Sequence, residues 1–199
     1  MFAEILRQRL AGIVELSADQ VEALEKHYRL LERWNRSLNL TSIDRLEETV
    51  ERHYCESLFV GQFLKQFPQR IADIGTGAGF PGFPLAILRR DCSVTLIESH
   101  QRKAVFLKEA SRGLLNIRVM AKRAEEVPET FDWAVSRAVS YEDLAGSLPR
   151  LASRVALLTG SEVPPASLGY VWRLPVALPW GKQRFLRVGD RVSRETSST

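Results

Sequence analysis

The sequence predicts an α/β protein with a mostly parallel β-sheet flanked by helices and with an N-terminal helical extension. From residue 71 onward, short apolar segments alternate with amphipathic segments, as in repeated strand–helix–strand units. A glycine-rich turn at residues 75–79 directly follows the first of these short segments. Residues 1–67 lack this alternation, and their apolar side chains recur at helical spacing.

The N-terminal part of the chain is expected to form two long helices. Ser17 and Gln20 fit the pattern of a capping box, and an apolar stripe follows over residues 21–38. Asp44 is expected to start the next helix, whose apolar face continues as far as Pro68. The expected division of the chain is a helical extension at 1–67, a ligand-binding α/β domain at 68–190 and a disordered polar tail at 191–199.

Five short apolar segments are predicted to be the strands of the sheet, near residues 71–74, 93–98, 117–120, 131–136 and 154–159. Helices are expected near residues 82–90, 101–112 and 141–149. Parallel strands joined by such helices form right-handed crossovers. Residues 169–178 and 184–188 are expected to form a final hairpin pair that closes one edge of the sheet.

The turn after the first strand suits a ligand that rests against bare backbone, because Gly75, Gly77 and Gly79 carry no side chain. Asp73 ends the strand, and its carboxylate would repel a pyrophosphate but attract an ammonium group. A dinucleotide turn requires G-x-G-x-x-G directly after the strand, and the sixth position from Gly75 is Phe80. The frame from Gly77 to Gly82 does match this pattern, but the strand then ends two residues too early and Asp73 has no role. S-adenosylmethionine therefore fits better than NAD, and a turn without any ligand is the remaining alternative.

A second acidic residue ends the next predicted strand. Glu98 follows the glycine turn by about 20 residues, which is the spacing of a carboxylate that binds a ribose diol. NAD enzymes share this feature, and a solvated acid at the strand end is the other interpretation. Ligands of parallel sheets bind at the carboxyl ends of the strands, so we expect Asp73, Glu98, the turn at 122–126 and Arg137 to meet at one site.

The composition indicates one main hydrophobic core, since 45% of the 199 residues are hydrophobic. No apolar run approaches about 18 residues, so a cytoplasmic location and no membrane partner are expected. Cys55 and Cys92 lack the spacing of metal ligands, and no metal is expected. The net charge is +4, and cations cluster at residues 102–123 and 151–199. Each cluster fits either an acidic partner or a solvated surface.

Six longer motifs stand along the chain and carry a resemblance to a known family. They are Trp34-Asn35 with Asn39-Leu40-Thr41, His53-x-x-Glu56-Ser57-Leu58, Asp73-x-Gly75-x-Gly77-x-Gly79-x-Pro81-Gly82-x-Pro84-Leu85-Ala86, Leu96-Ile97-Glu98-Ser99, Arg123-Ala124-Glu125-Glu126 and Ser136-Arg137-Ala138. With these motifs the chain resembles the bacterial glucose-inhibited division protein B family over roughly residues 25–190. Members of that family methylate the N7 atom of a guanine in small-subunit (16S) ribosomal RNA. The resemblance implies a Rossmann-like class I methyltransferase fold, S-adenosylmethionine as cofactor, and the ribosomal RNA or the small subunit as partner.

The resemblance also implies cofactor-binding residues, namely Asp73, Gly75, Gly77, Gly79, Phe80, Glu98, Ala124, Glu125 and Arg137. Ala124 and Glu125 are expected to contact the adenine. Arg137 is the expected substrate-orienting residue, because a guanidinium can hold a phosphate or the O6/N7 edge of guanine. A structural pairing of Arg137 with Asp132 or Glu98 is the alternative. The expected RNA-binding residues are Arg123, Lys182, Arg184, Arg187 and, if it is not simply packed in a helix, His53.

Three positions depart from the family pattern. Glu56 and Glu98 each stand where the family has Asp, so the charge is kept but moved by one methylene group. Thr159-Gly160 replaces the Lys-Gly pair of the family, and a cationic side chain is missing there.

The implied chemistry requires no general base, because guanine N7 carries a lone pair and no proton. Catalysis then consists mainly of holding N7 and the methyl group in line at about 3–3.5 Å. The alternatives are a methyltransferase for a protein or small molecule, an NAD-dependent oxidoreductase, and a noncatalytic RNA-binding protein. A monomer is expected.

Overall fold

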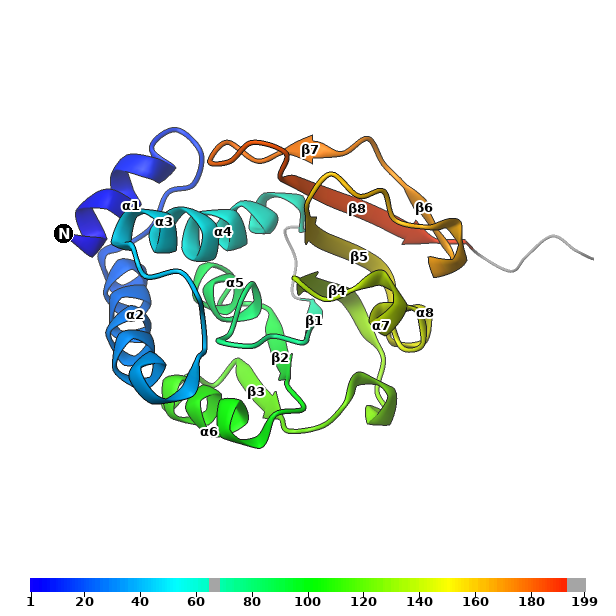
Figure 1. Cartoon of the computed structure of the whole chain (residues 1–199), viewed down its shortest axis with the longest axis horizontal. Helices are drawn as coiled ribbons and strands as arrows, with labels where there is room; N and C mark the ends of the chain where they lie inside the picture. Colours follow the sequence, from blue (N-terminus) through cyan, green and yellow to red (C-terminus); the bar gives the residue numbers. More distant parts are fainter. Residues whose placement is uncertain (65–68, 193–199) are drawn as a thin grey trace, which may run out of the picture.

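The computed structural model describes residues 1–64 and 69–192, which form one sheet between two layers of helices (Figure 1). The strands are β1 (Arg70–Ile74), β2 (Ser93–Ile97), β3 (Ile117–Met120), β4 (Phe131–Arg137), β5 (Ala152–Thr159), β6 (Tyr170–Trp172), β7 (Val176–Ala177) and β8 (Phe185–Arg191). Their order is β3-β2-β1-β4-β5-β8-β6, and β7 also pairs with β8. The first five strands are parallel, which confirms the predicted mostly parallel sheet.

The C-terminal strands close one edge of the sheet, as expected. β8 runs antiparallel between β5 and β6, so that β6 is the edge strand. The expectation that a disordered tail starts at residue 191 is wrong at its first residue, because Arg191 pairs with Tyr170 in the sheet. The rest of that expectation, at residues 193–199, lies outside the described residues.

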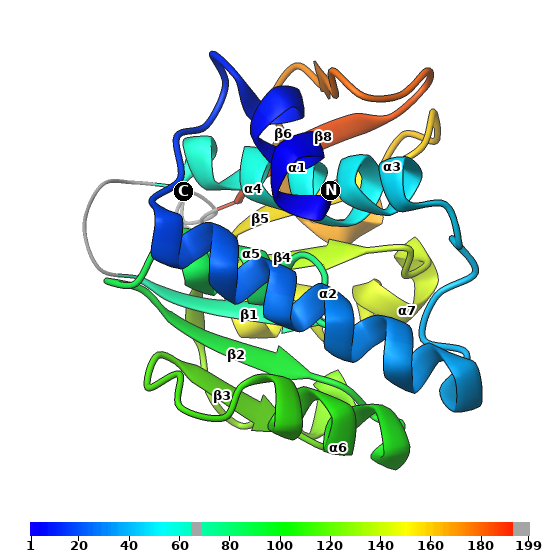
Figure 2. The ribbon, with the colours of Figure 1, turned by 90° about the vertical axis from the view of Figure 1, so that its left-hand side faces the viewer.

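Helices cover both faces of the sheet. One face carries α1 (Phe2–Leu10), α2 (Ala18–Leu38), α3 (Leu46–Thr49), α4 (Glu56–Val60), α5 (Gly82–Leu88) and α6 (Gln101–Ala110), which lie in front of the strands in Figure 2. The other face carries α7 (Tyr141–Ala145) and α8 (Leu148–Leu151). A single helix at 141–149 was expected, but the chain turns at Gly146 and Ser147, and Pro149 lies in the first turn of α8.

The start of α2 has the predicted capping box. The Ser17 hydroxyl accepts a hydrogen bond from the Gln20 amide at 3.2 Å, and the Gln20 side chain accepts one from the Ser17 amide at 2.9 Å. These two bonds satisfy donors that the first helical turn leaves free. Asn39 ends the helix in the left-handed region, with φ of 32°, and turns the chain into the segment 40–45.

The second long helix differs from the expectation at its start and in its middle. It begins at Leu46 after Arg45, and Asp44 makes no cap, so the expected start at Asp44 is wrong. Its central turn is a π-helix, η1 (Val50–Cys55), between α3 and α4. A π-turn contains one residue more than an α-turn and is often found at functional sites.

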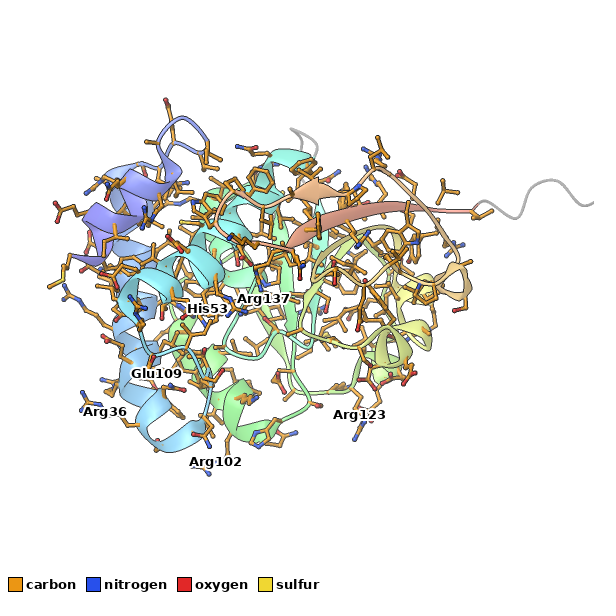
Figure 3. All side chains as sticks on the ribbon, turned by 45° about the horizontal axis from the view of Figure 1, so that its top comes forward. Arg36, His53, Arg102, Glu109, Arg123 and Arg137 are labelled. Carbon is orange, nitrogen blue, oxygen red and sulfur yellow. The ribbon has the colours of Figure 1, made fainter. Side chains whose placement is uncertain are left out.

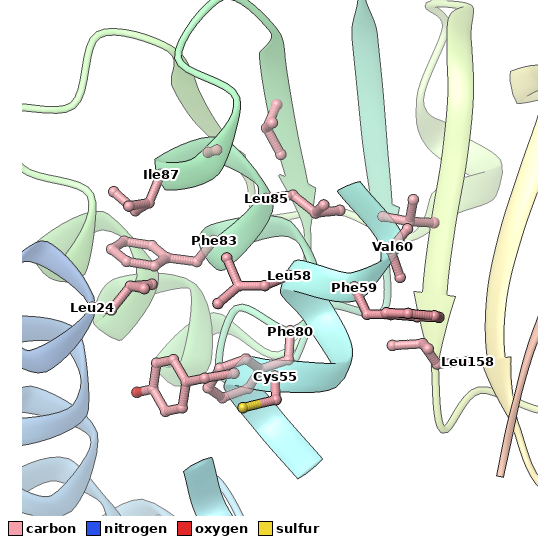
Figure 4. Packing of buried hydrophobic residues seen from close by; sticks show 14 of the residues in the cluster. Leu24, Cys55, Leu58, Phe59, Val60, Phe80, Phe83, Leu85, Ile87 and Leu158 are labelled. Atoms are coloured by element: carbon pink, nitrogen blue, oxygen red, sulfur yellow. The ribbon is translucent and has the colours of Figure 1, made fainter. Parts of the chain in front are cut away.

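The N-terminal helices and the sheet share a hydrophobic core. Figure 4 shows Leu58 and Phe59 of α4 packed between Leu85 of α5 and Leu158 of β5. Segments far apart in sequence also join by polar contacts, since the Trp180 indole donates to the Arg9 carbonyl oxygen at 3.1 Å. The expected boundary between residues 67 and 68 lies outside the described residues, and the division into an extension and a domain stays a prediction.

Candidate active site at the carboxyl ends of the strands

Asp73, Glu98 and Arg137 come together at one edge of the sheet, as the sequence predicts. They stand at or directly after the last residues of β1, β2 and β4, which are neighbouring parallel strands. The glycine loop after β1 lies against the end of β2, because the Gly75 and Thr76 amides donate to the Ile97 carbonyl oxygen at 3.0 and 3.2 Å.

The backbone of the glycine loop is left-handed at Gly77, with φ of 59°. A Cβ atom at this residue would meet nothing closer than the Gly75 carbonyl oxygen at 4.0 Å, so the space in front of the backbone is open. An L-residue would be strained by this φ value and would also project into that space. At Gly77 the loop therefore presents bare main chain to a ligand, whereas Val139 covers Gly75 and Phe83 covers Gly79.

Asp73 is fully buried beneath the glycine loop. Its Oδ2 atom accepts hydrogen bonds from the Thr76 hydroxyl at 2.5 Å and from the Gly82 amide at 2.7 Å. Its Oδ1 atom is buried and has no partner among the described residues. Burial raises the pKa of the Asp73 carboxyl to about 7, although both hydrogen bonds act in the opposite direction.

Two residues that hold Asp73 were not singled out from the sequence as its partners. A Cβ atom at Gly82 would lie 2.7 Å from the Asp73 Oδ2 atom, so only glycine lets the start of α5 approach the carboxylate. The Thr76 hydroxyl supplies the second donor. Both lie inside the glycine motif, and the spacing of its glycines does not indicate which of its residues bind Asp73.

Glu98 is bound to the loop and is only 7% exposed. Its two carboxylate oxygens accept from the Gly77 amide at 2.9 Å and from the His100 amide at 2.8 Å. The interpretation as a solvated strand-end acid is therefore wrong. A carboxylate has about four acceptor sites, so binding of a ribose hydroxyl stays a prediction that these two bonds permit.

α2 supports the glycine loop from below through His27, which the sequence did not identify. The His27 Nε2 atom lies 3.0 Å from the Ala78 carbonyl oxygen, and Nδ1 lies 2.8 Å from the Tyr54 hydroxyl. The ring stacks on Phe83 with 4.1 Å between centroids. Burial lowers the pKa of His27 to about 3, so the imidazole is neutral. No sequence signal marks this role, because His27 stands in an ordinary apolar stripe.

Ala124 and Glu125 form the short 3-10 turn that follows β3. The Arg150 guanidinium donates to their carbonyl oxygens at 3.0 and 3.1 Å, so this backbone is fixed at the rim of the site. Arg123 precedes the turn and is exposed, and its side chain points outward, as does that of Arg102 (Figure 3). The contact of Ala124 and Glu125 with an adenine stays a prediction.

Arg137 is held by the N-terminal helices. Its Nη1 atom donates to the Arg52 carbonyl oxygen at 2.6 Å and to His53 Nδ1 at 2.8 Å, and the guanidinium lies over the Phe80 ring. The alternative pairing with Asp132 or Glu98 is wrong, because neither carboxylate contacts Arg137 in a hydrogen bond. Burial lowers the pKa of Arg137 to about 10, which keeps it charged at neutral pH.

His53 is packed inside the protein at 4% exposure. Its ring stacks on Phe80 with 4.6 Å between centroids, and its Nε2 atom lies 2.7 Å from the Thr41 hydroxyl. Burial and the neighbouring Arg137 charge lower the pKa of His53 to about 2. Figure 3 shows His53 and Arg137 side by side. A stacking contact of His53 with RNA stays untested, but its ring is already covered by Phe80.

A cavity of about 690 Å³ opens beside Arg137 and is lined by the segment 39–43, by the end of β4 and by the start of the turn after β5. Ala138 lines it in a left-handed conformation, with φ of 57°, and this turn places the Val139 side chain against Gly75. The cavity therefore adjoins the first glycine of the loop. Its volume accommodates a nucleotide, since ligand pockets range over roughly 300–1,000 Å³.

Two of the expected RNA-binding arginines are engaged inside the protein. Arg184 forms an ion pair with Glu56, which is 0% exposed, at 2.6 and 2.5 Å. Arg187 is 8% exposed and donates to the Thr159 hydroxyl at 3.1 Å and to the Ser161 carbonyl oxygen at 3.2 Å. Lys182 is exposed. RNA contacts by all three stay predictions, but only Lys182 has the surface position that the sequence suggested.

No helix within residues 1–64 and 69–192 is long and apolar enough to cross a membrane. The same residues contain no group of three side chains that could hold a metal ion. Cys55 and Cys92 are buried free thiols.

The parallel sheet, with its glycine loop after β1, has the Rossmann-like fold that is found in methyltransferases. A solved S-adenosylmethionine-dependent methyltransferase from Aquifex aeolicus matches 73% of this chain and 93% of its own, with a TM-score of 0.59 and 18% identity. Magnesium protoporphyrin IX methyltransferase from Synechocystis, solved with bound S-adenosylmethionine, matches 90% of this chain and 99% of its own, with a TM-score of 0.61 and 13% identity. These similarities concern the fold alone.

Within this class the chain belongs to the GidB family, described as rRNA small subunit methyltransferase G, whose profile matches residues 20–153. A ribosomal RNA small subunit methyltransferase G from Nitrosococcus oceani is 42% identical over 129 residues, which are 63% of this chain and 59% of that protein. The protein of the same name from Halorhodospira halophila is 40% identical over 146 residues, or 72% of this chain and 69% of that protein. The chain thus spans about 60% of the length of the first of these relatives.

Proposed function

We propose that the protein transfers a methyl group from S-adenosylmethionine to the N7 atom of a guanine in small-subunit (16S) ribosomal RNA. The observation that carries this proposal is the open glycine loop over a buried carboxylate, directly beside a nucleotide-sized cavity. The names of the relatives supply the substrate class.

The residues present fit S-adenosylmethionine. The unpartnered Oδ1 atom of Asp73 can accept a hydrogen bond from the ammonium group or from a water bound to it. Gly75, Gly77, Gly79 and Phe80 provide the backbone on which the cofactor lies, while Glu98 receives the ribose and the Ala124–Glu125 turn receives the adenine. When bound there, the cofactor supplies an electrophilic methyl group on a sulfonium.

The cavity is suited to a nucleophile that needs no deprotonation. His53, its nearest imidazole, has a pKa of about 2 and engages both of its ring nitrogens, so it is not available as a base. Guanine N7 has a free lone pair and fits this environment. The lone pair must face the methyl group, so Arg137 cannot bind N7 during transfer. Its Nε and Nη2 atoms have no partner in the described part of the chain and can hold a phosphate in a bidentate manner.

The outer surface of the site is suited to RNA. Arg123, which follows β3, and Lys182, which precedes β8, are both exposed, and we assign them to phosphate contacts. We assign His53, Arg184 and Arg187 to the structure of the cavity wall, where they shape the surface that RNA meets. The proposal includes a cytoplasmic location and action as a monomer on the RNA or the small subunit.

The experiment is to incubate the protein with S-adenosylmethionine labelled in the methyl group and with either naked small-subunit RNA or assembled subunits from cells that lack the activity. The expected result is label in one guanine, which depurination and chain cleavage then map to its N7 atom. Label in protein or in small molecules would support the other methyltransferases. A thermal shift with NAD, but none with S-adenosylmethionine or S-adenosylhomocysteine, would favour the oxidoreductase.

A further inference from the structure

One wall of the cavity is the connection between α2 and α3, and it is held in place by side chains. The Asn35 side chain makes two hydrogen bonds to the backbone of Thr41. Its amide nitrogen donates to the Thr41 carbonyl oxygen at 2.9 Å, and its amide oxygen accepts from the Thr41 amide at 2.9 Å. Thr41 lines the 690 Å³ cavity on one side and a smaller one of about 250 Å³ on the other.

The position of the hydrogen atom on His53 follows from its partners. Arginine can only donate, so His53 Nδ1 must accept from the Arg137 guanidinium. The imidazole is neutral, because burial and the Arg137 charge lower the pKa of His53 to about 2. The hydrogen of the ring is therefore on Nε2, and it is donated to the Thr41 hydroxyl oxygen at 2.7 Å.

This arrangement fixes the role of the Thr41 hydroxyl. Its oxygen accepts a second hydrogen bond from the Ile43 amide at 3.1 Å, so both of its lone pairs are used. The hydroxyl hydrogen then points in the one remaining direction. No acceptor for it occurs among residues 1–64 and 69–192. Thr41 thus carries one unused donor on the wall that separates the two cavities.

We propose that Thr41 determines base specificity by donating its hydroxyl hydrogen to the O6 atom of the target guanine. The proposal rests on the function proposed above, in which guanine N7 faces the methyl group. O6 is the acceptor next to N7 in guanine, whereas adenine places an amino donor there. A neutral hydroxyl suits a neutral carbonyl, while the charged Arg137 suits a phosphate. His53 is a positioning residue, because it occupies a lone pair of the hydroxyl and so directs its hydrogen.

The test compares two substrates in three enzymes. Single-turnover methyl transfer is measured on small-subunit RNA that carries either guanine or 2-aminopurine, which has N7 but no O6, at the mapped target. The enzymes are the wild type, Thr41→Val, which keeps the shape but has no hydroxyl, and Thr41→Ser, which restores the hydroxyl. Melting temperature and cofactor affinity serve as controls, because the hydrogen bonds of Thr41 are to Asn35, His53 and Ile43 and not to the glycine loop.

The expected result is that Thr41→Val lowers the rate on guanine by about 10-fold, the effect of one lost hydrogen bond, and leaves the rate on 2-aminopurine unchanged. Thr41→Ser should return the preference for guanine. Equal loss on both bases would mean that Val only disturbs the wall, and it would overturn the proposal, as would an unchanged preference. A wild-type enzyme that does not methylate the guanine of the unsubstituted RNA would instead overturn the proposed function itself.

Discussion

The raised pKa of Asp73 should make the affinity for S-adenosylmethionine depend on pH. The Asp73 carboxyl has a pKa of about 7 in the folded protein without cofactor, compared with an ordinary value of 3.8, because it is buried. The ionised form attracts the ammonium group of S-adenosylmethionine. Affinity should therefore rise from pH 6 to pH 8, by up to about tenfold per pH unit below pH 7. Calorimetry at several pH values measures this change, which should be absent in Asp73→Asn.

Stability should change in the opposite direction. A raised carboxyl pKa contributes stability that is complete below pH 3.8 and is lost as the pH rises through 7. Urea unfolding of the cofactor-free protein should show this loss between pH 5 and 8, and Asp73→Asn should reduce it. Asp132→Asn, at the other end of β4, is the matched control and should behave as the wild type. Identical curves for all three would mean that Asp73 does not titrate in this range.

Arg137 binds the N-terminal helices through Nη1, while its Nε and Nη2 atoms are proposed to bind a phosphate. A lysine at this position distinguishes the proposed phosphate contact from a purely structural role. Arg137→Lys keeps the charge but loses the guanidinium fork, so methyl transfer at saturating cofactor should fall by about 10-fold or more, while cofactor affinity persists. Arg154→Lys on β5 is the control, since its guanidinium also lies over a ring, that of Trp133, but away from the site. A normal transfer rate in Arg137→Lys at normal melting temperature would remove Arg137 from the substrate contacts.

Between elements, the Glu56–Arg184 ion pair joins α4 to the residue directly before β8. Arg184→Met would leave the Glu56 carboxylate buried without its partner, which should lower the free energy of unfolding by about 3 kcal/mol. The double change Glu56→Gln with Arg184→Met should recover most of this loss. Arg173→Met breaks the exposed pair with Asp190 and should cost less than about 1 kcal/mol in urea unfolding. Equal losses of unfolding free energy in Arg184→Met and Arg173→Met would show that the buried ion pair is no more important for stability than the exposed one.

The π-turn illustrates where sequence patterns stop being informative about an element. The apolar residues Leu46, Val50, Tyr54 and Leu58 are spaced by exact fours, which drift around a regular helix of 3.6 residues per turn. A wider turn at 50–55 corrects the drift and aims both His53 and the Arg52 carbonyl at Arg137. The spacing predicted a helix correctly, but the π-type hydrogen bonding of its central turn was not predicted.

Over the whole molecule, the basic cluster of residues 102–123 is divided between two edges of the sheet. α6 begins and β3 ends at the edge that carries the site, which places Arg102 and Arg123 there, while Arg112 lies at the opposite edge. Arg123→Glu and Lys182→Glu should each reduce the dependence of log affinity for RNA on log salt by about one unit. Filter binding over a range of salt measures this slope. Arg112→Glu should leave the slope unchanged. Equal slopes in all variants would mean that Arg123 and Lys182 are solvated and do not contact RNA.

The positions that the sequence predicted best depend only on strand order. Asp73 and Arg137 lie at the ends of their strands and Glu98 directly follows its strand. A parallel sheet brings such strand ends together whatever packs around them. The surroundings of Arg184 and Arg187 were not predictable in this way. Glu56 lies 128 residues from Arg184 in the sequence, and no periodicity links partners so distant. Charge composition suggested RNA contacts, but tertiary pairing decides which cations reach the surface.

The contact between Trp180 and the Arg9 carbonyl oxygen has a consequence for the synthesis of the chain. The two residues are 171 positions apart, so the partner of α1 leaves the ribosome long after α1 itself. During that interval the apolar side chains Phe2, Leu6 and Leu10 lack part of the core that finally buries them. We expect newly made chains to expose part of this apolar surface while translation continues, and exposed apolar surface is bound by chaperones. The core around α1 would thus be completed only after residue 180 has been made.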